Sequence, residues 1–289
     1  MKRIAESELI INNDGSMFHL HIKPEQLADR ILLCGDPARV SMIAGYFDTQ
    51  ECDISSREFH TITGTYKGKR ISVVSHGIGC DNMDIVINEL DALANINFAT
   101  RQLRPDFRQL TMVRIGTSGG LQPFTPVGSY VAAQKSIGFD GVVYFYKDNE
   151  KVRDIDMEDE LIPQLDWNIT VIRPYVVSAD ASLIEQISRE AIFRGMTIAA
   201  NGFYGPQGRE LRLTLTDSNL NRKIETFRLE ERCITNFEME SSALAGLAAM
   251  MGHRAMTVCY IIAGRIDKNM NTDYKDSLPV LIEKVLDRI

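Results

Sequence analysis

The sequence predicts an α/β protein built around a central mixed β-sheet, and two observations support this fold class. Short apolar stretches typical of strands alternate along the chain with amphipathic stretches typical of helices. Four of the apolar stretches are followed by Gly35, Gly77, Gly116 and Gly264, at the carboxyl ends of strands, where ligands bind in such sheets. With 289 residues, 44% of them hydrophobic, the chain can fill a large core, and we expect one domain because no boundary is visible.

The first elements form a strand, a turn and a helix. Residues 30–34 (RILLC) have the length and apolar character of a buried strand. Asp36 can cap the helix that follows and Pro37 fits its first turn, which predicts a helix over 37–47. A second strand is expected over 70–77.

The remaining elements follow from the same criteria. Helical spacing of apolar residues and glycines after the last turn indicate helices, whereas short β-branched runs indicate strands. We expect helices over 84–96, 182–195, 241–252 and 278–289, and strands over 111–116, 128–137, 197–205 and 255–264. The acidic stretch 154–160 is expected to be a solvated loop or helix face and not a metal site.

Composition and charge exclude several classes of protein. A net charge of -7 and a pI near 5.4 argue against partners such as nucleic acid or an anionic membrane, because both need a basic protein face. The five cysteines are widely spaced without a CxxC pair, which favours neither disulfides nor zinc. The first residues lack a signal-peptide pattern, and no apolar run is long enough to cross a bilayer. We therefore expect a cytoplasmic protein with no nucleic-acid or membrane partner.

One short segment suggests an anion site. In RIGTSGG, residues 114–120, an arginine stands ahead of three glycines, with a threonine and a serine between them. Because glycine lets the backbone bend and approach a ligand closely, we expect a loop in which Arg114 and two hydroxyl groups meet an oxyanion. The residues alone leave open that the glycines only turn the chain and that Arg114 faces solvent.

Other nucleotide-binding and hydrolase motifs are incomplete or missing in the sequence. Residues 77–82 (GIGCDN) start like a dinucleotide fingerprint, but Asn82 stands in place of its third glycine. Residues 64–70 (GTYKGKR) are one residue short of a P-loop and end in arginine. The five histidines show no metal-ligand spacing, and no GxSxG elbow occurs. The sequence therefore does not support NAD, NTPase, zinc or serine-hydrolase chemistry.

Six segments together resemble a known family, the nucleoside phosphorylases of the uridine and bacterial purine type. They occur in the family's order and approximate spacing, at residues 34–40, 56–61, 75–79, 114–120, 203–209 and 236–244. The resemblance runs from about residue 18 to residue 265. It implies one phosphorylase domain over 1–289, with 1–17 as an N-terminal extension, and a mixed sheet that is partly barrel-like and flanked by helices.

Within this family, the resemblance points to the branch that acts on uridine. Gln207 and Arg209 match the Q-x-R pair with which that branch holds a pyrimidine. The implied activity is reversible phosphorolysis, in which uridine and phosphate give uracil and ribose 1-phosphate. Purine-type relatives carry an aspartate just after the last core strand, where this chain has Gly264. The alternatives are a purine or broad-specificity phosphorylase, a nucleosidase that uses water, and a catalytically silent protein that binds a nucleoside or phosphate.

The resemblance places phosphate among Gly35, Arg39, Arg114 and Thr117, and it brings Arg57 in from a neighbouring subunit. The residue chemistry is consistent, because guanidinium groups match pairs of phosphate oxygens and helix N-termini attract anions. A shared site implies a homodimer as the minimum unit, and bacterial members of the family join three dimers into a homohexamer. Phosphate is then a co-substrate, and no cofactor is required.

For the ribose, the resemblance assigns Glu240 to the 2′ and 3′ hydroxyl groups and Met239 to the sugar face. Glu238 is expected to support the loop, and His19 to touch the 5′-hydroxyl group across the subunit interface. An ionised carboxylate only accepts hydrogen bonds, and its charge favours the cationic sugar that develops as the glycosidic bond breaks.

Four residues are implied at the base: Phe203, Gln207, Arg209 and Arg265. Arg209 would stabilise the negative charge that spreads over the carbonyl oxygens of the leaving pyrimidine. The Gln207 amide can both donate and accept at the pyrimidine edge, while Phe203 stacks on the ring. Ile261 and Ile262 are expected in the wall of the pocket.

Some members of the family bind potassium between subunits through a glutamate, a backbone carbonyl group and a serine. Glu58 and Ile78 match the first two ligands, but Asn82 replaces the serine. The resemblance therefore leaves a potassium site in this chain undecided.

Overall fold

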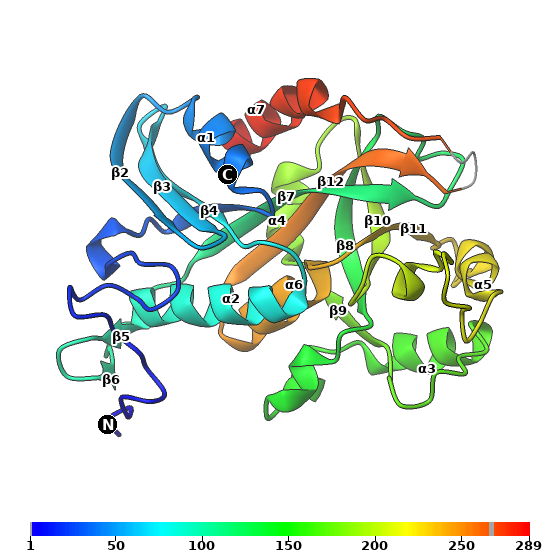
Figure 1. The fold of residues 1–289 in the computed structure, drawn as a ribbon, viewed down its shortest axis with the longest axis horizontal. Helices are drawn as coiled ribbons and strands as arrows, with labels where there is room; N and C mark the ends of the chain where they lie inside the picture. Colours follow the sequence, from blue (N-terminus) through cyan, green and yellow to red (C-terminus); the bar gives the residue numbers. More distant parts are fainter. Residues whose placement is uncertain (1, 266–268) are drawn as a thin grey trace.

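The apolar strands form the middle of one large sheet in the computed structural model, which describes residues 2–265 and 269–289 (Figure 1). The strands of this sheet are β1 (Arg30–Cys34), β2 (Thr49–Ser56), β3 (Phe59–Tyr66), β4 (Lys69–Ser75), β7 (Thr111–Gly120), β8 (Tyr130–Gly138), β9 (Tyr175–Ser178), β10 (Ile192–Ala199), β11 (Ile234–Glu238) and β12 (Arg254–Gly264). A separate short pair consists of β5 (Ile96–Asn97) and β6 (Gln102–Leu103). The helices are α1 (Pro37–Ala44), α2 (Cys80–Asn95), α3 (Ile155–Gln164), α4 (Ala181–Ile187), α5 (Leu220–Thr226), α6 (Ser241–Met250) and α7 (Leu278–Arg288).

Part of the large sheet closes on itself. The strand order is β11-β10-β8-β12-β7-β1-β4-β3-β2, and β11 also pairs with β7, so that β7, β12, β8, β10 and β11 form a barrel. β1 runs parallel to both of its neighbours, β4 and β7. β8 and β12 run antiparallel to each other, so the sheet is mixed. The predicted α/β fold with a mixed, partly barrel-like sheet is confirmed.

Helices cover both faces of the sheet, because successive side chains of a strand point to opposite faces (Figure 1). In β1, Ile31 and Leu33 belong to the core that α2 and α6 cover. Leu32 and Cys34 belong to the core that α1, α4 and α7 cover. β1 is therefore buried on both sides, which explains why residues 30–34 are almost continuously apolar.

The segment 182–195, predicted as one helix, holds α4 and the start of β10. Between these elements, Glu190 and Ala191 adopt positive φ angles, which a continuing helix does not tolerate. Gly195, predicted to stop the helix, lies inside the strand, where an added Cβ would come within 2.2 Å of the Thr235 Oγ1 atom. The prediction was wrong here because the apolar residues kept a helical spacing through a turn of irregular backbone.

The glycines after Arg114 also differ from their prediction. They do not form a loop, since β7 continues to Gly120 and pairs with β12 along its length. An added Cβ at Gly116 would lie 2.6 Å from the Arg114 Nη1 atom, and one at Gly120 would lie 2.7 Å from the Thr125 carbonyl oxygen. These glycines therefore permit close packing around Arg114 within a strand, and Gly116 does not stand at a strand end.

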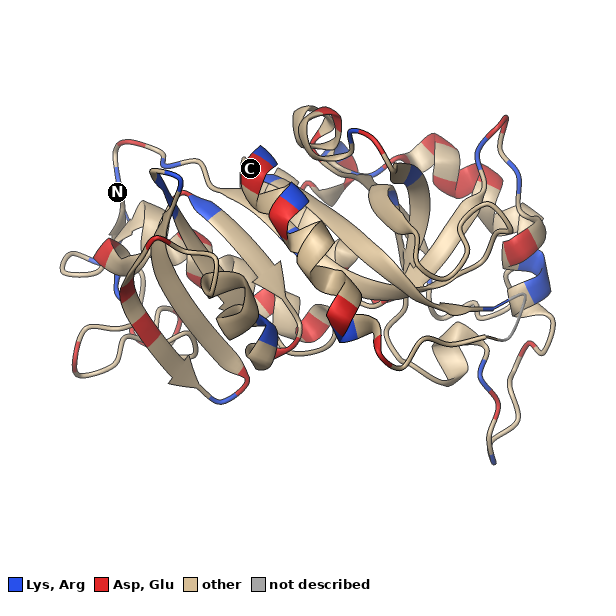
Figure 2. Cartoon of the chain, turned by 90° about the horizontal axis from the view of Figure 1, so that it is seen from above, with Lys and Arg blue, Asp and Glu red and all other residues tan. Residues whose placement is uncertain are grey.

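Charged residues of both signs are interspersed over the outer helices and loops, while the central strands carry few of them (Figure 2). The acidic stretch 154–160 falls largely in α3, where Asp154 caps the helix. Glu158 is buried beside Arg153, so the expectation of a solvated face is wrong for this residue.

Over residues 2–265 and 269–289, no cluster of three or more His, Cys, Asp or Glu side chains could hold a metal. None of the helices in these ranges combines the length and apolar character that crossing a bilayer requires.

Candidate active site

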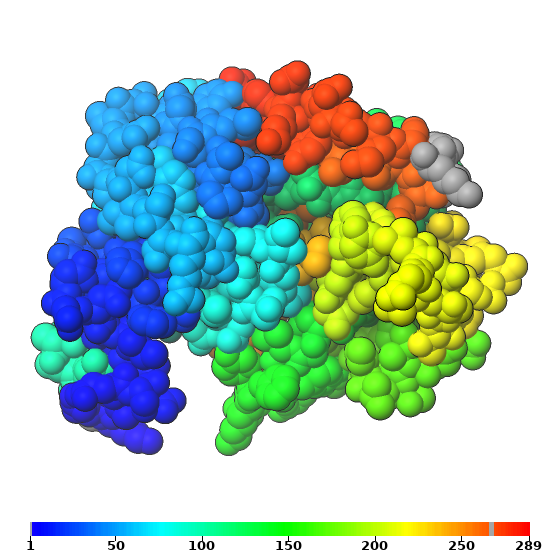
Figure 3. Space-filling model, viewed as in Figure 1, coloured from blue at the N-terminus to red at the C-terminus, as the bar shows by residue number. Residues whose placement is uncertain are grey.

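A cleft of about 1230 Å³ opens at the carboxyl ends of β1, β4, β7 and β12. Figure 3 shows this face hollowed between the cyan start of α2 and the yellow-green segment that follows β10. Most residues predicted for the site line the cleft: Gly35, Arg39, Arg114, Thr117, Phe203, Gln207, Arg209, Glu238, Met239, Glu240, Ile262 and Arg265. The fold thus gathers in one place residues that are dispersed along the sequence.

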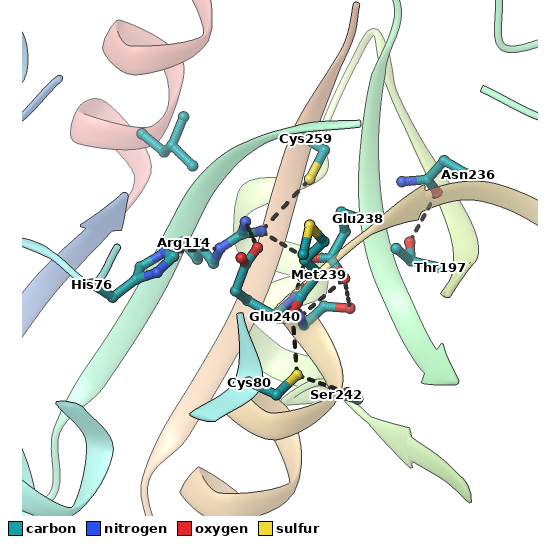
Figure 4. A network of polar contacts seen from close by, with 12 residues as sticks. His76, Cys80, Arg114, Thr197, Asn236, Glu238, Met239, Glu240, Ser242 and Cys259 are labelled. Atoms are coloured by element: carbon teal, nitrogen blue, oxygen red, sulfur yellow. Dashed lines mark hydrogen bonds and ion pairs between the residues drawn. The ribbon is translucent and has the colours of Figure 1, made fainter. Parts of the chain in front are cut away.

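Arg114 is buried at the floor of the cleft and donates to four side chains, those of His76, Glu238, Glu240 and, over 3.8 Å, the Cys259 Sγ atom (Figure 4). Its Nε donates to the Nε2 atom of His76 over 3.1 Å, its Nη1 donates to Glu238 Oε2 over 2.9 Å, and its Nη2 donates to Glu240 Oε2. Burial opposes the charge of Arg114, but the two carboxylates outweigh this effect and raise its pKa. We call Arg114, His76, Glu238 and Glu240 the Arg114 cluster.

His76 is fully buried, and the sequence had given it no role. Burial, followed by the positive charges of Arg114 and Arg39, lowers the pKa of His76 well below its ordinary value. The imidazole is therefore neutral near pH 7 and can accept the hydrogen bond from the Arg114 Nε atom. The available sequence signal was its place in the SHGIG segment, residues 75–79.

Two carboxylates of the β11–α6 connection meet at Arg114 but have different surroundings. Glu238 accepts hydrogen bonds from the backbone nitrogens of Glu240 and Ser241 and from the Ser241 hydroxyl group, so it orders the connection. Glu240 Oε1 accepts from the Gly79 nitrogen over 2.7 Å, at the N-terminus of α2. Burial raises the pKa of Glu240, and the charge of Arg114 opposes this shift.

Arg39 is a second buried guanidinium group in the cleft. Its Nη1 atom donates to the Ile115 carbonyl oxygen, and no carboxylate within the described residues forms an ion pair with it. Thr117 and Ser118 on β7 line the same cleft, and the buried Ser118 hydroxyl group has no hydrogen-bond partner in the described part of the chain. A cation without a counter-ion beside hydroxyl groups can receive an anion.

Phe203, Gln207, Arg209 and Arg265 form a second group, which we call the Arg209 cluster. The Arg209 guanidinium lies 3.8 Å from the centre of the Phe203 ring and donates to the Gln207 Oε1 atom over 2.6 Å. Arg265 donates to the Gln207 carbonyl oxygen. Burial and the nearby positive charge of Arg265 lower the pKa of Arg209 to about 10. Among the residues that the structure describes, neither arginine has a carboxylate within ion-pair distance.

Three predicted residues do not line this cleft. Ile261 is buried in the core formed around β12, whereas Ile262 reaches the cleft wall. Arg57 and His19 lie together elsewhere on the surface, with the Arg57 guanidinium 5.9 Å from the Phe18 ring centre and the His19 ring 4.7 Å from it. The structure therefore does not bring Arg57 and His19 to the cleft of their own subunit.

The three residues weighed for potassium lie together at the edge of the cleft. The Nδ2 atom of Asn82 donates to the Glu58 Oε1 atom over 3.3 Å, and Ile78 beside them is largely exposed. Potassium is a hard cation that takes oxygen ligands, whereas here an amide hydrogen faces the carboxylate. Within one subunit the Glu58 carboxylate is therefore engaged by the Asn82 amide group.

The fold and the cleft define a class of enzyme that binds an anion and a polar ring in one site at the carboxyl end of a partly closed sheet. The chain belongs to the phosphorylase superfamily, since the family model matches residues 29–286. This match spans the strands and helices that build the cleft.

Relatives with known activities extend over nearly the whole chain. The uridine phosphorylase of Thermococcus kodakarensis is 29% identical over 272 residues, which cover 92% of this chain and 84% of that protein. A DeoD-type purine nucleoside phosphorylase of Streptococcus suis is 25% identical over 255 residues, which cover 88% of this chain and 89% of that protein. The crystal structure of the Trypanosoma brucei nucleoside phosphorylase, described as showing uridine phosphorylase activity, is similar with a TM-score of 0.88 at 29% identity, covering 97% of this chain and 98% of that one.

Proposed function

We propose that this chain catalyses the reversible phosphorolysis of uridine to uracil and ribose 1-phosphate. The observation that carries the proposal is that Gln207 and Arg209 share one cleft with Arg39 and Arg114. The first pair suits a pyrimidine edge, and the second pair suits phosphate. The similar proteins of Thermococcus kodakarensis and Trypanosoma brucei support the choice of uridine.

Phosphate binds beside Arg39, which has a buried guanidinium group and no carboxylate partner among residues 2–265 and 269–289. Gly35 and the start of α1 lie at the same place, where backbone N–H groups favour an anion. The one N–H group of Arg114 that His76, Glu238, Glu240 and Cys259 leave free, on Nη2, and the Thr117 hydroxyl group complete the site. Phosphate is already an anionic nucleophile, so the reaction needs no side chain as a general base.

The ribose is held by Glu240, with Met239 against the sugar. The carboxylate of Glu240 is fixed by the Arg114 guanidinium and the Gly79 nitrogen, so it is oriented before substrate binds. As the bond from C1′ to the base lengthens, positive charge develops on the sugar, and the fixed negative charges of Glu240 and phosphate stabilise it. Glu238 and His76 hold Arg114 and thereby keep Glu240 in place.

The leaving pyrimidine takes up negative charge that the Arg209 cluster stabilises. Arg209 and Arg265 provide two positive charges, and neither forms an ion pair with a carboxylate of the described residues, so both can interact with the anion as it forms. The Gln207 amide pairs with the O2 and N3 edge of uracil, and Phe203 stacks on the ring. A base with the opposite donor and acceptor pattern would leave buried polar groups unpaired.

The active unit in this proposal is a homodimer. Arg57 and His19 do not line the cleft of their own subunit and both lie beside the Phe18 ring, as expected if both serve a neighbouring site. Arg57 then completes the phosphate site and His19 contacts the ribose 5′-hydroxyl group. A homohexamer of three such dimers would keep every site shared in the same way.

No metal or organic cofactor enters this scheme, and inorganic phosphate is the co-substrate. We place the enzyme in the cytoplasm, because all five cysteines are free thiols. There it serves uridine catabolism and pyrimidine salvage, since free uracil and ribose 1-phosphate are its products.

The experiment that tests the proposal is base release from uridine, thymidine, inosine and adenosine, each with and without phosphate. We expect uracil from uridine only when phosphate is present. Release from inosine in place of uridine would assign the chain to the purine branch, in line with its similarity to the Streptococcus suis protein. Release without phosphate would indicate a nucleosidase, and no release from any nucleoside would contradict an enzymatic role.

A further inference from the structure

A buried carboxylate on α2 binds the segment that carries His19. Glu89 is 7% exposed and accepts three hydrogen bonds from this segment. They come from the backbone nitrogens of His19 and Leu20, over 3.2 and 2.9 Å, and from the His19 Nδ1 atom over 2.6 Å. The two backbone bonds tether the segment, whereas the third bond acts only on the imidazole ring.

The bond to the ring decides which nitrogen of His19 carries the hydrogen. An ionised carboxylate only accepts, so Nδ1 must be the donor. In neutral imidazole the other nitrogen, Nε2, then has a free lone pair and is an acceptor. The ring also contacts Phe18 and Phe59 at centroid distances of 4.7 and 6.1 Å, which fixes its plane. The imidazole is 24% exposed and can reach a ligand outside its own subunit's cleft.

We propose that Glu89 is a positioning residue that fixes the tautomer and orientation of His19, so that Nε2 accepts a hydrogen bond from the 5′-hydroxyl group of the nucleoside in the neighbouring subunit. This inference rests on the proposed function. It assigns Glu89 no contact with substrate. It predicts that substitution of Glu89 weakens the binding only of nucleosides that carry a 5′-hydroxyl group.

The test compares uridine with 5′-deoxyuridine in the variant Glu89→Gln. The Gln side chain can accept through one oxygen only and can present a donor to the ring, so His19 loses its fixed tautomer. We expect the KM for uridine to rise about three- to tenfold, the range of one lost hydrogen bond, with little change in kcat. The KM for 5′-deoxyuridine should not change. His19→Ala should show the same selectivity, and combining both substitutions should add nothing further.

A matched control exists on the same helix. The Leu110 nitrogen donates to the His253 Nδ1 atom, so Nε2 of the same ring donates to Asp91 Oδ1 over 3.0 Å, and this imidazole is fully buried away from the cleft. Asp91→Asn therefore disturbs a second carboxylate–imidazole pair of α2 that has no role in binding. It should lower the thermal unfolding temperature without changing the ratio of the two KM values.

A second measurement uses the unsubstituted protein and does not depend on how Glu89→Gln folds. The ¹⁵N chemical shifts of the His19 ring report which nitrogen is protonated, and we expect hydrogen on Nδ1 and none on Nε2. Hydrogen on Nε2, with or without hydrogen on Nδ1, would overturn the inference, as would equal KM increases for both nucleosides or no increase for uridine. Failure of the proposed function would be seen separately, as absence of uracil release by the unsubstituted protein.

Discussion

In the Arg114 cluster a buried guanidinium faces two carboxylates and a neutral imidazole, whereas in the Arg209 cluster two partly buried guanidinium groups have no carboxylate partner among the described residues. Both clusters pack on β7, where Gly116 lies against Arg114 and Gly119 lies against Arg265. The first cluster is a compensated network, in which the loss of one partner would leave a buried charge unpaired. The second keeps its positive charge available for a ligand, and this difference separates residues that stabilise the protein from residues that serve only the reaction.

Arg114→Ala tests the compensated network and should have the largest effect. It leaves the carboxylates of Glu238 and Glu240 buried without their cation, which costs about 3–5 kcal/mol of unfolding free energy. Phosphorolysis should fall at least about 10³-fold, because one substitution affects both phosphate and the Glu240 carboxylate. Denaturant unfolding and steady-state kinetics measure the two effects. A variant as stable as the unsubstituted protein would show that the network is not required for folding.

Arg209→Ala tests the uncompensated cluster. We expect kcat/KM for uridine to fall about 10²- to 10³-fold, the effect of one lost transition-state donor. Stability should change by less than about 1 kcal/mol, because no buried carboxylate loses its partner. The same assays apply, and Arg212→Ala in the exposed segment just beyond is the control, expected to change neither quantity. Unchanged turnover in Arg209→Ala would place the base elsewhere.

Subunit mixing tests whether a third cation reaches the site from a neighbour. Arg57→Ala and Arg209→Ala subunits should each be inactive alone. After exchange, half of the dimers are mixed and each holds one intact site, so about a quarter of the original activity should return. Native mass spectrometry verifies the exchange. No recovery in verified mixed dimers would argue for a site built within one subunit.

His76→Gln should have the smallest effect, a change in how stability depends on pH. The pKa of His76 lies below its ordinary value of 6.5 in the folded state, so the unfolded chain binds more protons. His76 therefore contributes stability above pH 6.5 that is lost as pH falls, by up to about 1.4 kcal/mol per pH unit. Unfolding measured across this range should show a shallower decline in His76→Gln. Identical slopes would mean that His76 is protonated in the folded protein.

How much of this arrangement could be predicted from sequence depends on whether the signal is local. The strand over 30–34 and the helix from Pro37 were predictable, because strand, cap and first turn are adjacent in the sequence. The continuation of β7 through Gly119 and Gly120, beyond the predicted strand over 111–116, was not, since it depends on pairing with β12, far along the chain. The antiparallel strands β2 and β3 were also not predicted, because β2 is largely exposed and polar.

The same distinction applies to the candidate site. Arg114, Gln207 and Glu240 were found because each sits in a short segment with a recognisable pattern. His76 lies in the SHGIG segment, but its role depends on Arg114, 38 positions later. Glu89 had no such pattern, because its partner His19 lies 70 positions earlier. Residues that hold other residues are defined by contacts, and these become visible only in the folded chain.

The central claim is that phosphate attacks C1′ of uridine while the Arg209 cluster receives the leaving base. The most direct test is to incubate the protein with uridine and phosphate and to identify the sugar product by ³¹P NMR. The account predicts a phosphate monoester resonance from ribose 1-phosphate that grows in step with free uracil. Uracil accompanied by free ribose, with the phosphate resonance unchanged, would contradict it.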